Sequence, residues 1–231
     1  MVEKEFSYPV GKSAGQISAL LVRPENARWL LVFAHGAGAG IRHLFMAGTA
    51  MSLADHGIAS FRYHFPYMER GRRAPDPQPV LLETVHSAIA AARDCAGDLP
   101  MLAGGKSLGG RMTSTAAGRE PLPGVRGLVF FGFPLHAPGK PSDERGRHLD
   151  EVSLPMLFLQ GTRDNLADLT LLRPLCDRLQ GQARLHVIDG ADHSFNVPKK
   201  SGRTEEDVLA ELGQVVADWA SGLGAGPDRS A

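Results

Sequence analysis

Residues 100–111 read PMLAGGKSLGGR, and this stretch decides the fold class of the chain. The apolar start, 100–103, predicts a short strand, and residues 111–119 after the glycines predict a helix. Between them, Gly105 to Gly109 match the pattern G-x-S-x-G, in which a sharp strand-to-helix turn exposes the serine hydroxyl. Glycines let the backbone of such a turn approach neighbouring elements closely. Ser107 is therefore the candidate nucleophile.

A glycine-rich phosphate-binding loop is the main alternative interpretation of these residues. Such a loop has the pattern G-x-x-x-x-G-K-[ST], in which backbone N–H groups cradle phosphates. Pro100 stands where the first glycine of that pattern belongs. The sequence therefore favours a nucleophile over a phosphate cradle at Ser107.

Predicted strands and helices alternate on both sides of this turn. Strands are expected at 17–22 (paired in a hairpin with 6–10), 29–34, 58–63, 100–103, 125–131, 154–160 and 185–188. Helices are expected at 43–56, 80–96, 111–119, 169–179 and 205–219. This alternation predicts an α/β fold with a mostly parallel central sheet and helices on both faces. In such sheets, functional sites lie at the carboxyl ends of the strands.

Two long segments, 66–79 and 136–151, are polar and are expected to be loops. Neither is long enough or apolar enough to fold as a cap domain. A chain of 231 residues fits a single α/β sheet, since such domains reach roughly 250 residues. We therefore expect one domain, 1–231, in which 222–231 form a frayed tail.

A serine nucleophile needs a base, and the base needs a carboxylate that orients it. Asp164 directly follows the predicted strand 154–160, and His193 follows the predicted strand 185–188. The order serine, acid, histidine is that of the architecture in which G-x-S-x-G occurs. Because all three residues stand at the carboxyl ends of strands, they are expected at one edge of the sheet.

Other downstream residues compete for these two roles. His186 is the one other histidine after the predicted acid, and it lies inside a predicted strand. Asp168 lies four residues further into the next element. Asp189 and Asp192 are so near the predicted base that they are expected to shape its turn. The sequence therefore favours Asp164 as the acid.

An enzyme of this type also needs an oxyanion hole of backbone donors. The N–H of Leu108, which follows the nucleophile, is one expected donor. The second is expected from the loop after the strand 29–34, with the N–H of Ala37 as the candidate. His35 begins that loop and is expected to hold it by hydrogen bonds, rather than to take part in the chemistry.

Four runs together resemble the α/β-hydrolase superfamily: HGAG at 35–38, GKSLGGR at 105–111, GTRD at 161–164 and ADHSF at 191–195. The resemblance covers roughly residues 5–220 and is greatest to the small group without a cap domain near the dienelactone hydrolases. The run GGKSLGGR, 104–111, looks like that of a poorly characterised α/β-hydrolase-like family of bacteria and eukaryotes. The resemblance implies an α/β-hydrolase fold, an acyl-enzyme intermediate, and Ser107, Asp164 and His193 as nucleophile, acid and base. Dienelactone hydrolases proper use a cysteine nucleophile, so a dienelactone substrate does not carry over to this chain.

The predicted function is hydrolysis of a small ester or thioester by a serine hydrolase, with a small-molecule acyl substrate. A peptidase or an acyltransferase using the same three residues stays open, because specificity resides in the pocket. A third hypothesis is a non-catalytic scaffold that binds a protein partner, and the complete set of three residues counts against it. The predicted chemistry requires no cofactor and no metal.

Composition narrows the classes of partner. The chain is 43% hydrophobic and 22% charged, which is ordinary for globular proteins and excludes wholesale disorder. Lys and Arg number 25, as do Asp and Glu, so no basic excess indicates a nucleic-acid partner. No apolar run approaches the roughly 18–20 residues of a membrane span, so no membrane partner is expected.

A cytoplasmic location is expected for two reasons. The first residues lack a basic segment followed by an apolar core, so no signal peptide is predicted. Cys95 and Cys176 are too few and too irregularly spaced for a disulfide scaffold or a structural zinc site. Both a monomer and a homodimer are compatible with the sequence.

Charged residues near the predicted site have two interpretations each. Lys106 could attract an anionic acyl group, but a lysine that points away and pairs at the surface is favoured. Arg62, Arg70, Arg72 and Arg73 could line a rim for acidic substrates, but a solvated loop is favoured.

Overall fold

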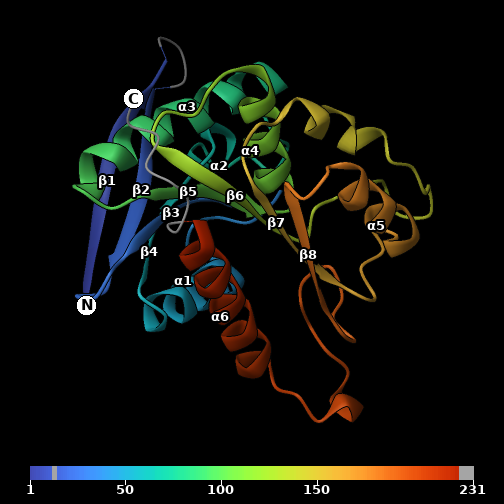
Figure 1. Cartoon of the computed structure of the whole chain (residues 1–231). Helices are drawn as coiled ribbons and strands as arrows, with labels where there is room; N and C mark the ends of the chain where they lie inside the picture. The colour runs from blue at the N-terminus through green and yellow to red at the C-terminus, as the bar shows by residue number, and fades with distance from the viewer. Residues whose placement is uncertain (12–14, 224–231) are drawn as a thin grey trace, which may run out of the picture.

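The computed structural model describes residues 1–11 and 15–223. Within these ranges eight strands form one twisted sheet in the order β1-β2-β4-β3-β5-β6-β7-β8 (Figure 1). The strands are β1 (Val2–Val10), β2 (Gly15–Arg23), β3 (Trp29–Ala34), β4 (Ile58–Tyr63), β5 (Met101–Lys106), β6 (Val125–Phe131), β7 (Met156–Gly161) and β8 (Ala183–Ile188). All neighbours from β4 to β8 are parallel, while β1–β2 and β2–β4 are antiparallel. This confirms the predicted mostly parallel α/β sheet.

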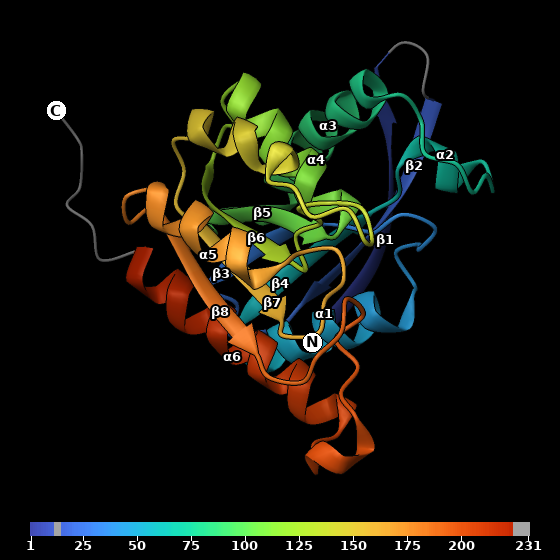
Figure 2. The same ribbon diagram turned by 90° about the vertical axis from the view of Figure 1, so that its right-hand side faces the viewer.

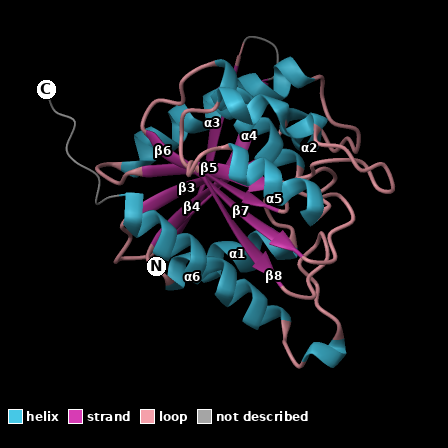
Figure 3. Ribbon diagram, turned by 45° about the vertical axis from the view of Figure 1, so that its right-hand side comes forward, coloured by secondary structure: helices cyan, strands magenta, loops and turns pink. Residues whose placement is uncertain are grey.

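Helices cover both faces of the sheet (Figures 2 and 3). They are α1 (Leu44–Asp55), α2 (Pro66–Glu69), α3 (Gln78–Ala96), α4 (Leu108–Arg119), η1 (Glu144–Glu151), α5 (Leu169–Arg178), η2 (Lys199–Ser201) and α6 (Glu205–Leu223), where η marks a 3-10 helix. One apolar layer lies under α1 and α6, and the other under α3, α4 and α5. In the described ranges, no helix combines the length and the apolar character that crossing a membrane requires.

Strand β3 shows why an uninterrupted apolar run forms a central strand. All six of its residues are buried. Leu31 and Phe33 pack in the layer of α1 and α6, whereas Leu30 and Val32 pack in the opposite layer. Successive side chains of a strand point to opposite faces, so a strand covered on both faces needs apolar residues at every position.

The predicted hairpin at the N-terminus is present and longer than expected. β1 pairs with β2 from Val2 opposite Arg23 to Val10 opposite Gly15. Residues 12–14, between the two predicted strands of this hairpin, lie outside the described residues. At the other end of the chain, α6 continues to Leu223, so 222 and 223 are helical rather than frayed. The rest of the predicted tail, 224–231, also lies outside the described residues.

The two predicted loops contain short helices that the sequence analysis missed. Pro66 opens α2 and Pro79 stands in the first turn of α3, positions where a fixed φ and a missing N–H cost nothing. The second loop holds η1, which is polar overall but buries Gly146 and Leu149. Neither segment builds a cap domain over the carboxyl ends of the strands, as predicted.

Candidate active site

Ser107 lies in a tight turn between β5 and α4. Its backbone has φ 51° and ψ −115°, a conformation that costs a non-glycine residue about 1–3 kcal/mol. Two glycines make the turn fit against β3, because a Cβ on Gly105 or Gly109 would lie 2.4 or 2.6 Å from the carbonyl oxygen of Ala34. The close approach predicted for these glycines is therefore present, and it leaves the Ser107 side chain half-buried at the strand end.

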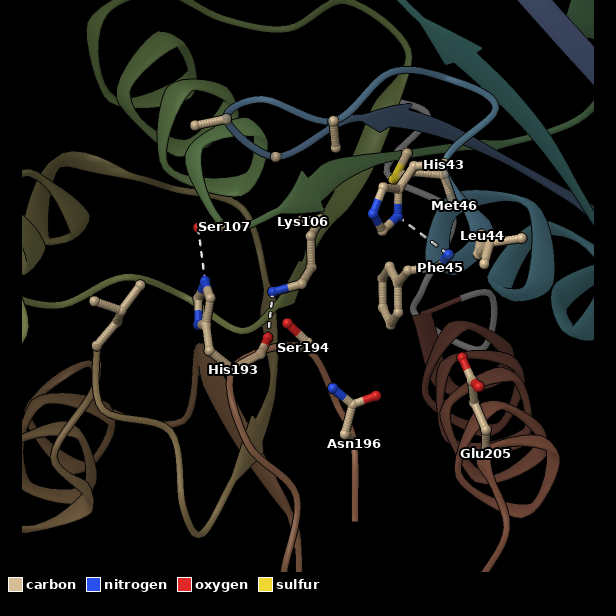
Figure 4. A pocket seen from close by; sticks show the side chains of 14 residues that line it. His43, Leu44, Phe45, Met46, Lys106, Ser107, His193, Ser194, Asn196 and Glu205 are labelled. Atoms are coloured by element: carbon tan, nitrogen blue, oxygen red, sulfur yellow. Dashed lines mark hydrogen bonds between the residues drawn. The ribbon is translucent and has the colours of Figure 1, made fainter. Parts of the chain in front are cut away.

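The structure brings the predicted nucleophile, base and acid together. The hydroxyl of Ser107 lies 2.9 Å from Nε2 of His193 (Figure 4), and Nδ1 of His193 lies 2.7 Å from Oδ2 of Asp164. A carboxylate only accepts hydrogen bonds, so Nδ1 carries the proton and Nε2 is free to accept from the serine. This arrangement is the one in which an imidazole can remove the proton of a serine.

Asp164 is buried and receives three donors. In addition to His193, the side-chain amide of Gln160 donates to Oδ2 at 2.5 Å, and the N–H of Leu166 donates to Oδ1 at 2.8 Å. Together they fix the plane of the carboxylate. Gln160 was missed by sequence reasoning, although a glutamine inside the apolar strand 154–160 was a signal that its amide needs a buried partner.

The competing residues have partners of their own. Asp168 caps α5 by accepting from the N–H of Thr170 at 2.8 Å. Asp192 accepts from the N–H groups of Ser194 and Asn196 at 2.8 and 2.9 Å, so it shapes the turn around His193 as predicted. The remaining two competitors also have partners away from Ser107. Nε2 of His186 lies 2.6 Å from Oε1 of Glu211, and Oδ1 of Asp189 accepts a hydrogen bond from Oγ1 of Thr162.

The two predicted oxyanion donors come from different elements. Leu108 is the first residue of α4, where N–H groups have no partner within the helix. Ala37 lies in the loop after β3 and lines the same cleft as Ser107. The loop of Ala37 lies close to the serine, since a Cβ on Gly36 would lie 3.7 Å from the Cβ of Ser107.

His35 holds the loop that carries Ala37. Its ring is buried, with Nε2 accepting from the N–H of Phe65 at 3.0 Å and Nδ1 donating to the carbonyl of Gly36 at 2.8 Å. These bonds connect the loop after β3 to the segment after β4. The geometry agrees with a structural role, as predicted.

The role of His35 predicts a loss of stability in a variant. Burial lowers the pKa of His35 from 6.5 to about 4. The neutral ring is therefore favoured in the folded state. Between about pH 6.5 and pH 4 the unfolded chain binds a proton at this histidine and the folded protein does not, so the free energy of unfolding falls as the pH drops through this range. We expect His35→Ala to lose about 2–4 kcal/mol of unfolding free energy at neutral pH, because a buried donor loses its partner and a cavity forms.

Urea unfolding at pH 7.5 and pH 5 would measure both effects. The variant should also lose part of the acid destabilisation that we expect for the wild type between these two pH values. His86→Ala, which removes a half-buried ring 3.9 Å from Glu120, is the control and should change stability by less than about 1 kcal/mol. Equal stability of His35→Ala and the wild type would show that the ring does not hold the loop.

A cleft of about 660 Å³ opens in front of Ser107 (Figure 4). Ser107 and His193 lie at one end, and the ring of Phe45 stands across from His193. The remaining wall combines apolar side chains with polar ones. The lining residues are Gly36, Ala37, Ala39, His43, Leu44, Phe45, Met46, Lys106, Ser107, Leu166, His193, Ser194, Asn196 and Glu205. The cleft suits a small, mainly apolar group next to the serine.

Two expectations for charged residues are wrong. Lys106 does not reach the surface: it is 9% exposed, and its Nζ donates to the carbonyl of His193 at 2.5 Å. Arg62 is not part of a solvated loop, because it lies within β4, is buried, and donates to the carbonyl of Ile41. Arg70, Arg72 and Arg73 are exposed, as a solvated loop requires.

The sequence of this chain matches a known protein family and several curated proteins. The family model described as "Alpha/beta hydrolase domain" matches residues 27–221. A provisionally named phosphoribosyl transferase of Mycobacterium tuberculosis is 29% identical over 208 residues, covering 88% of this chain and 43% of that protein. The chain thus spans less than half the length of the curated relatives that it matches.

Solved structures share the fold. The dienelactone hydrolase of Anabaena variabilis superimposes with a TM-score of 0.74 and 22% identity, covering 96% of this chain and 97% of that one. A Xanthomonas campestris protein described as a serine hydrolase without lid has a TM-score of 0.73 and 18% identity, covering 97% of each chain. At these identities the likeness concerns the fold.

Proposed function

Because the chain belongs to the alpha/beta hydrolase domain family, we propose that it is a serine hydrolase that cleaves a small ester or thioester. One observation carries the proposal: the contacts of 2.9 and 2.7 Å that connect Ser107 through His193 to Asp164. The strained turn at Ser107 adds support, since such strain gathers at functional sites.

In the first half of the proposed reaction, the Oγ of Ser107 attacks the carbonyl carbon while Nε2 of His193 takes its proton. Asp164 holds the imidazole in the required tautomer and stabilises the imidazolium. The N–H groups of Ala37 and Leu108 bind the negative oxygen of the tetrahedral intermediate. The bond to the leaving group then breaks, and His193 returns the proton to the departing alkoxide or thiolate.

In the second half, water replaces the leaving group. His193 takes a proton from water as its oxygen attacks the acyl-serine carbonyl, and the same backbone donors bind the second oxyanion. The bond to Oγ breaks, and Ser107 regains its proton from the imidazolium. The products are the free carboxylic acid and the unmodified serine.

The cleft supports a small acyl group. Phe45, Met46 and Leu166 line the cleft that opens in front of Ser107, and within residues 1–11 and 15–223 no cap domain covers the strand ends. Phosphoribosyl transfer, named for the Mycobacterium tuberculosis relatives, is not extended to this chain, which covers 43% of those proteins. Peptide cleavage and acyl transfer use the same three residues and are alternatives to be separated by substrate.

Labelling with a fluorophosphonate, followed by mass spectrometry of the peptides, tests the proposal. We expect a single adduct on Ser107, because an activated serine attacks the phosphorus and displaces fluoride. A folded protein that takes up no label would contradict the proposal and favour the non-catalytic scaffold. Short 4-nitrophenyl esters, acyl thioesters, peptide amides and an added alcohol acceptor then separate hydrolase, peptidase and acyltransferase.

A further inference from the structure

Lys106 places a charged side chain in an apolar layer. It is the last residue of β5, and strand alternation puts it on the same face as Leu102. Leu102 is fully buried in the layer beneath α1 and α6. Lys106 is itself only 9% exposed, so its ammonium does not extend into bulk water.

Among the residues that the structure describes, the ammonium has one hydrogen-bond acceptor, and it belongs to the predicted base. Nζ donates to the backbone carbonyl of His193 at 2.5 Å, as Figure 4 shows. The rings of Phe45 and Phe195 lie with their centroids 5.7 and 5.4 Å from Nζ. Among residues 1–11 and 15–223, no carboxylate lies within 4.0 Å of this nitrogen. A neutral carbonyl and two aromatic faces therefore flank a largely buried cation, whose side chain also lines the cleft.

Gly132, which directly follows β6, leaves room for this contact. Its φ is +69°, and a Cβ at this position would lie 3.1 Å from Nζ of Lys106 and 3.4 Å from the ring of His193. The ammonium, the imidazole and the glycine backbone thus pack against one another. The side chain next to Ser107 thus contacts the residue that carries the predicted base.

Fold stability does not account for a lysine here. Burying an ammonium carries a desolvation penalty, and replacing buried charges by apolar groups of similar size is often neutral or stabilising. The aromatic faces recover only part of that cost. Methionine would fill the same space without a charge. An ammonium at this position therefore has a role other than holding the core together.

We propose that Lys106 is a positioning residue for the general base: its ammonium fixes the His193 carbonyl and so keeps the imidazole between Ser107 and Asp164. The inference rests on the proposed serine hydrolase function. Lys106 directly precedes the nucleophile, so one residue ties the turn of Ser107 to the separate loop that carries His193. A displacement of about 1 Å between reacting groups can cost on the order of 100-fold in rate.

The titration of Lys106 provides a second readout. Burial lowers its pKa from 10.5 to about 8, while the negative charges of Asp164 and Asp192 act in the opposite direction. The imidazole of His193 is a further titratable group near the ammonium, since both lie within 3.4 Å of a Cβ built on Gly132, and Phe45 and Phe195 are uncharged. As the pH rises through about 8 the ammonium becomes an amine, and its bond to the carbonyl loses charge assistance. We therefore expect kcat to decline above this pH.

Lys106→Met, compared with Lys4→Met, tests the inference. Lys4 also stands over an aromatic ring, with Nζ 4.9 Å from the centroid of Phe6, but it is exposed and lies on β1. For 4-nitrophenyl acetate we expect Lys106→Met to lower kcat by roughly 10- to 100-fold with KM within about twofold. Its melting temperature should not fall, and its pH profile should lack the decline near pH 8. Lys4→Met should match the wild type in kcat.

Each other outcome overturns the inference. An unchanged kcat in Lys106→Met, or a wild-type kcat without a decline near pH 8, removes the positioning role. A variant that fails to fold, or melts several degrees lower, shows that the ammonium serves the fold. A wild type that neither hydrolyses esters nor takes up the fluorophosphonate overturns the proposed function as well. A reactive wild type beside an equally reactive Lys106→Met overturns this inference alone.

Discussion

Replacing Ser107 by alanine is expected to lower kcat/KM for a short 4-nitrophenyl ester by about 10⁴- to 10⁶-fold. The variant lacks the oxygen that forms the acyl-enzyme, so neither half of the proposed reaction can proceed through the serine. Some rate above that in water should remain, because the cleft and the backbone donors of Ala37 and Leu108 are unchanged. Fluorophosphonate labelling should disappear with the rate.

The fold should tolerate this change. Alanine meets the same strain at φ 51° as serine, and the substitution removes only the bond to Nε2 of His193. We expect the melting temperature to stay the same or rise slightly, as often happens when a functional group in a strained site is removed. Ser221→Ala, an exposed position on α6, is the matched control and should keep wild-type kinetics. A Ser107→Ala protein with more than a tenth of wild-type activity would exclude Ser107 as the nucleophile.

The fold and the serine–histidine–aspartate cluster were predictable from the sequence for the same physical reason. Buried parallel strands appear as apolar runs such as 29–34, and their carboxyl ends meet at one edge of the sheet. Polar residues that directly follow such runs therefore converge, however distant they are along the chain. Asp164 and His193 are 29 residues apart in the sequence, yet Oδ2 of Asp164 lies 2.7 Å from Nδ1 of His193.

Lys106 shows where this reasoning fails. The apolar run ends at Ala103, so the glycines and the lysine that follow were interpreted as a turn, whose side chains are free to point outward. In the structure β5 continues to Lys106, because Gly104 and Gly105 pair with neighbouring strands through their backbones. The alternation of the strand then turns the lysine inward. Backbone pairing of glycines leaves no hydrophobic pattern, so the sequence could not show it.

The donors around the acid were hidden for a related reason. Gln160 stands at the end of an apolar strand, and only the folded chain places its amide against Asp164. Short helices such as α2 and η1 carry too few residues for a periodic pattern to emerge. Pairwise contacts of this kind depend on tertiary packing rather than on local sequence.

Replacing Asp164 by asparagine is the second change expected to have a large effect, lowering kcat by about 10³- to 10⁴-fold. Three donors point at the carboxylate: Nδ1 of His193, Nε2 of Gln160 and the N–H of Leu166. An asparagine has one oxygen and an NH₂ group, so it cannot accept from all of them. Where its NH₂ faces Nδ1, the imidazole must carry its proton on Nε2 and cannot take one from Ser107.

Stopped-flow or steady-state hydrolysis of 4-nitrophenyl acetate would measure this loss, with KM expected to stay within about threefold because the apolar wall of the cleft is untouched. The control is Asp168→Asn, which changes the carboxylate closest in sequence to the predicted acid. Asp168 only caps α5, and asparagine caps a helix about as well as aspartate. Its kinetics and stability should therefore match the wild type. If Asp168→Asn lost the activity and Asp164→Asn kept it, the assignment of Asp164 as the acid would be wrong.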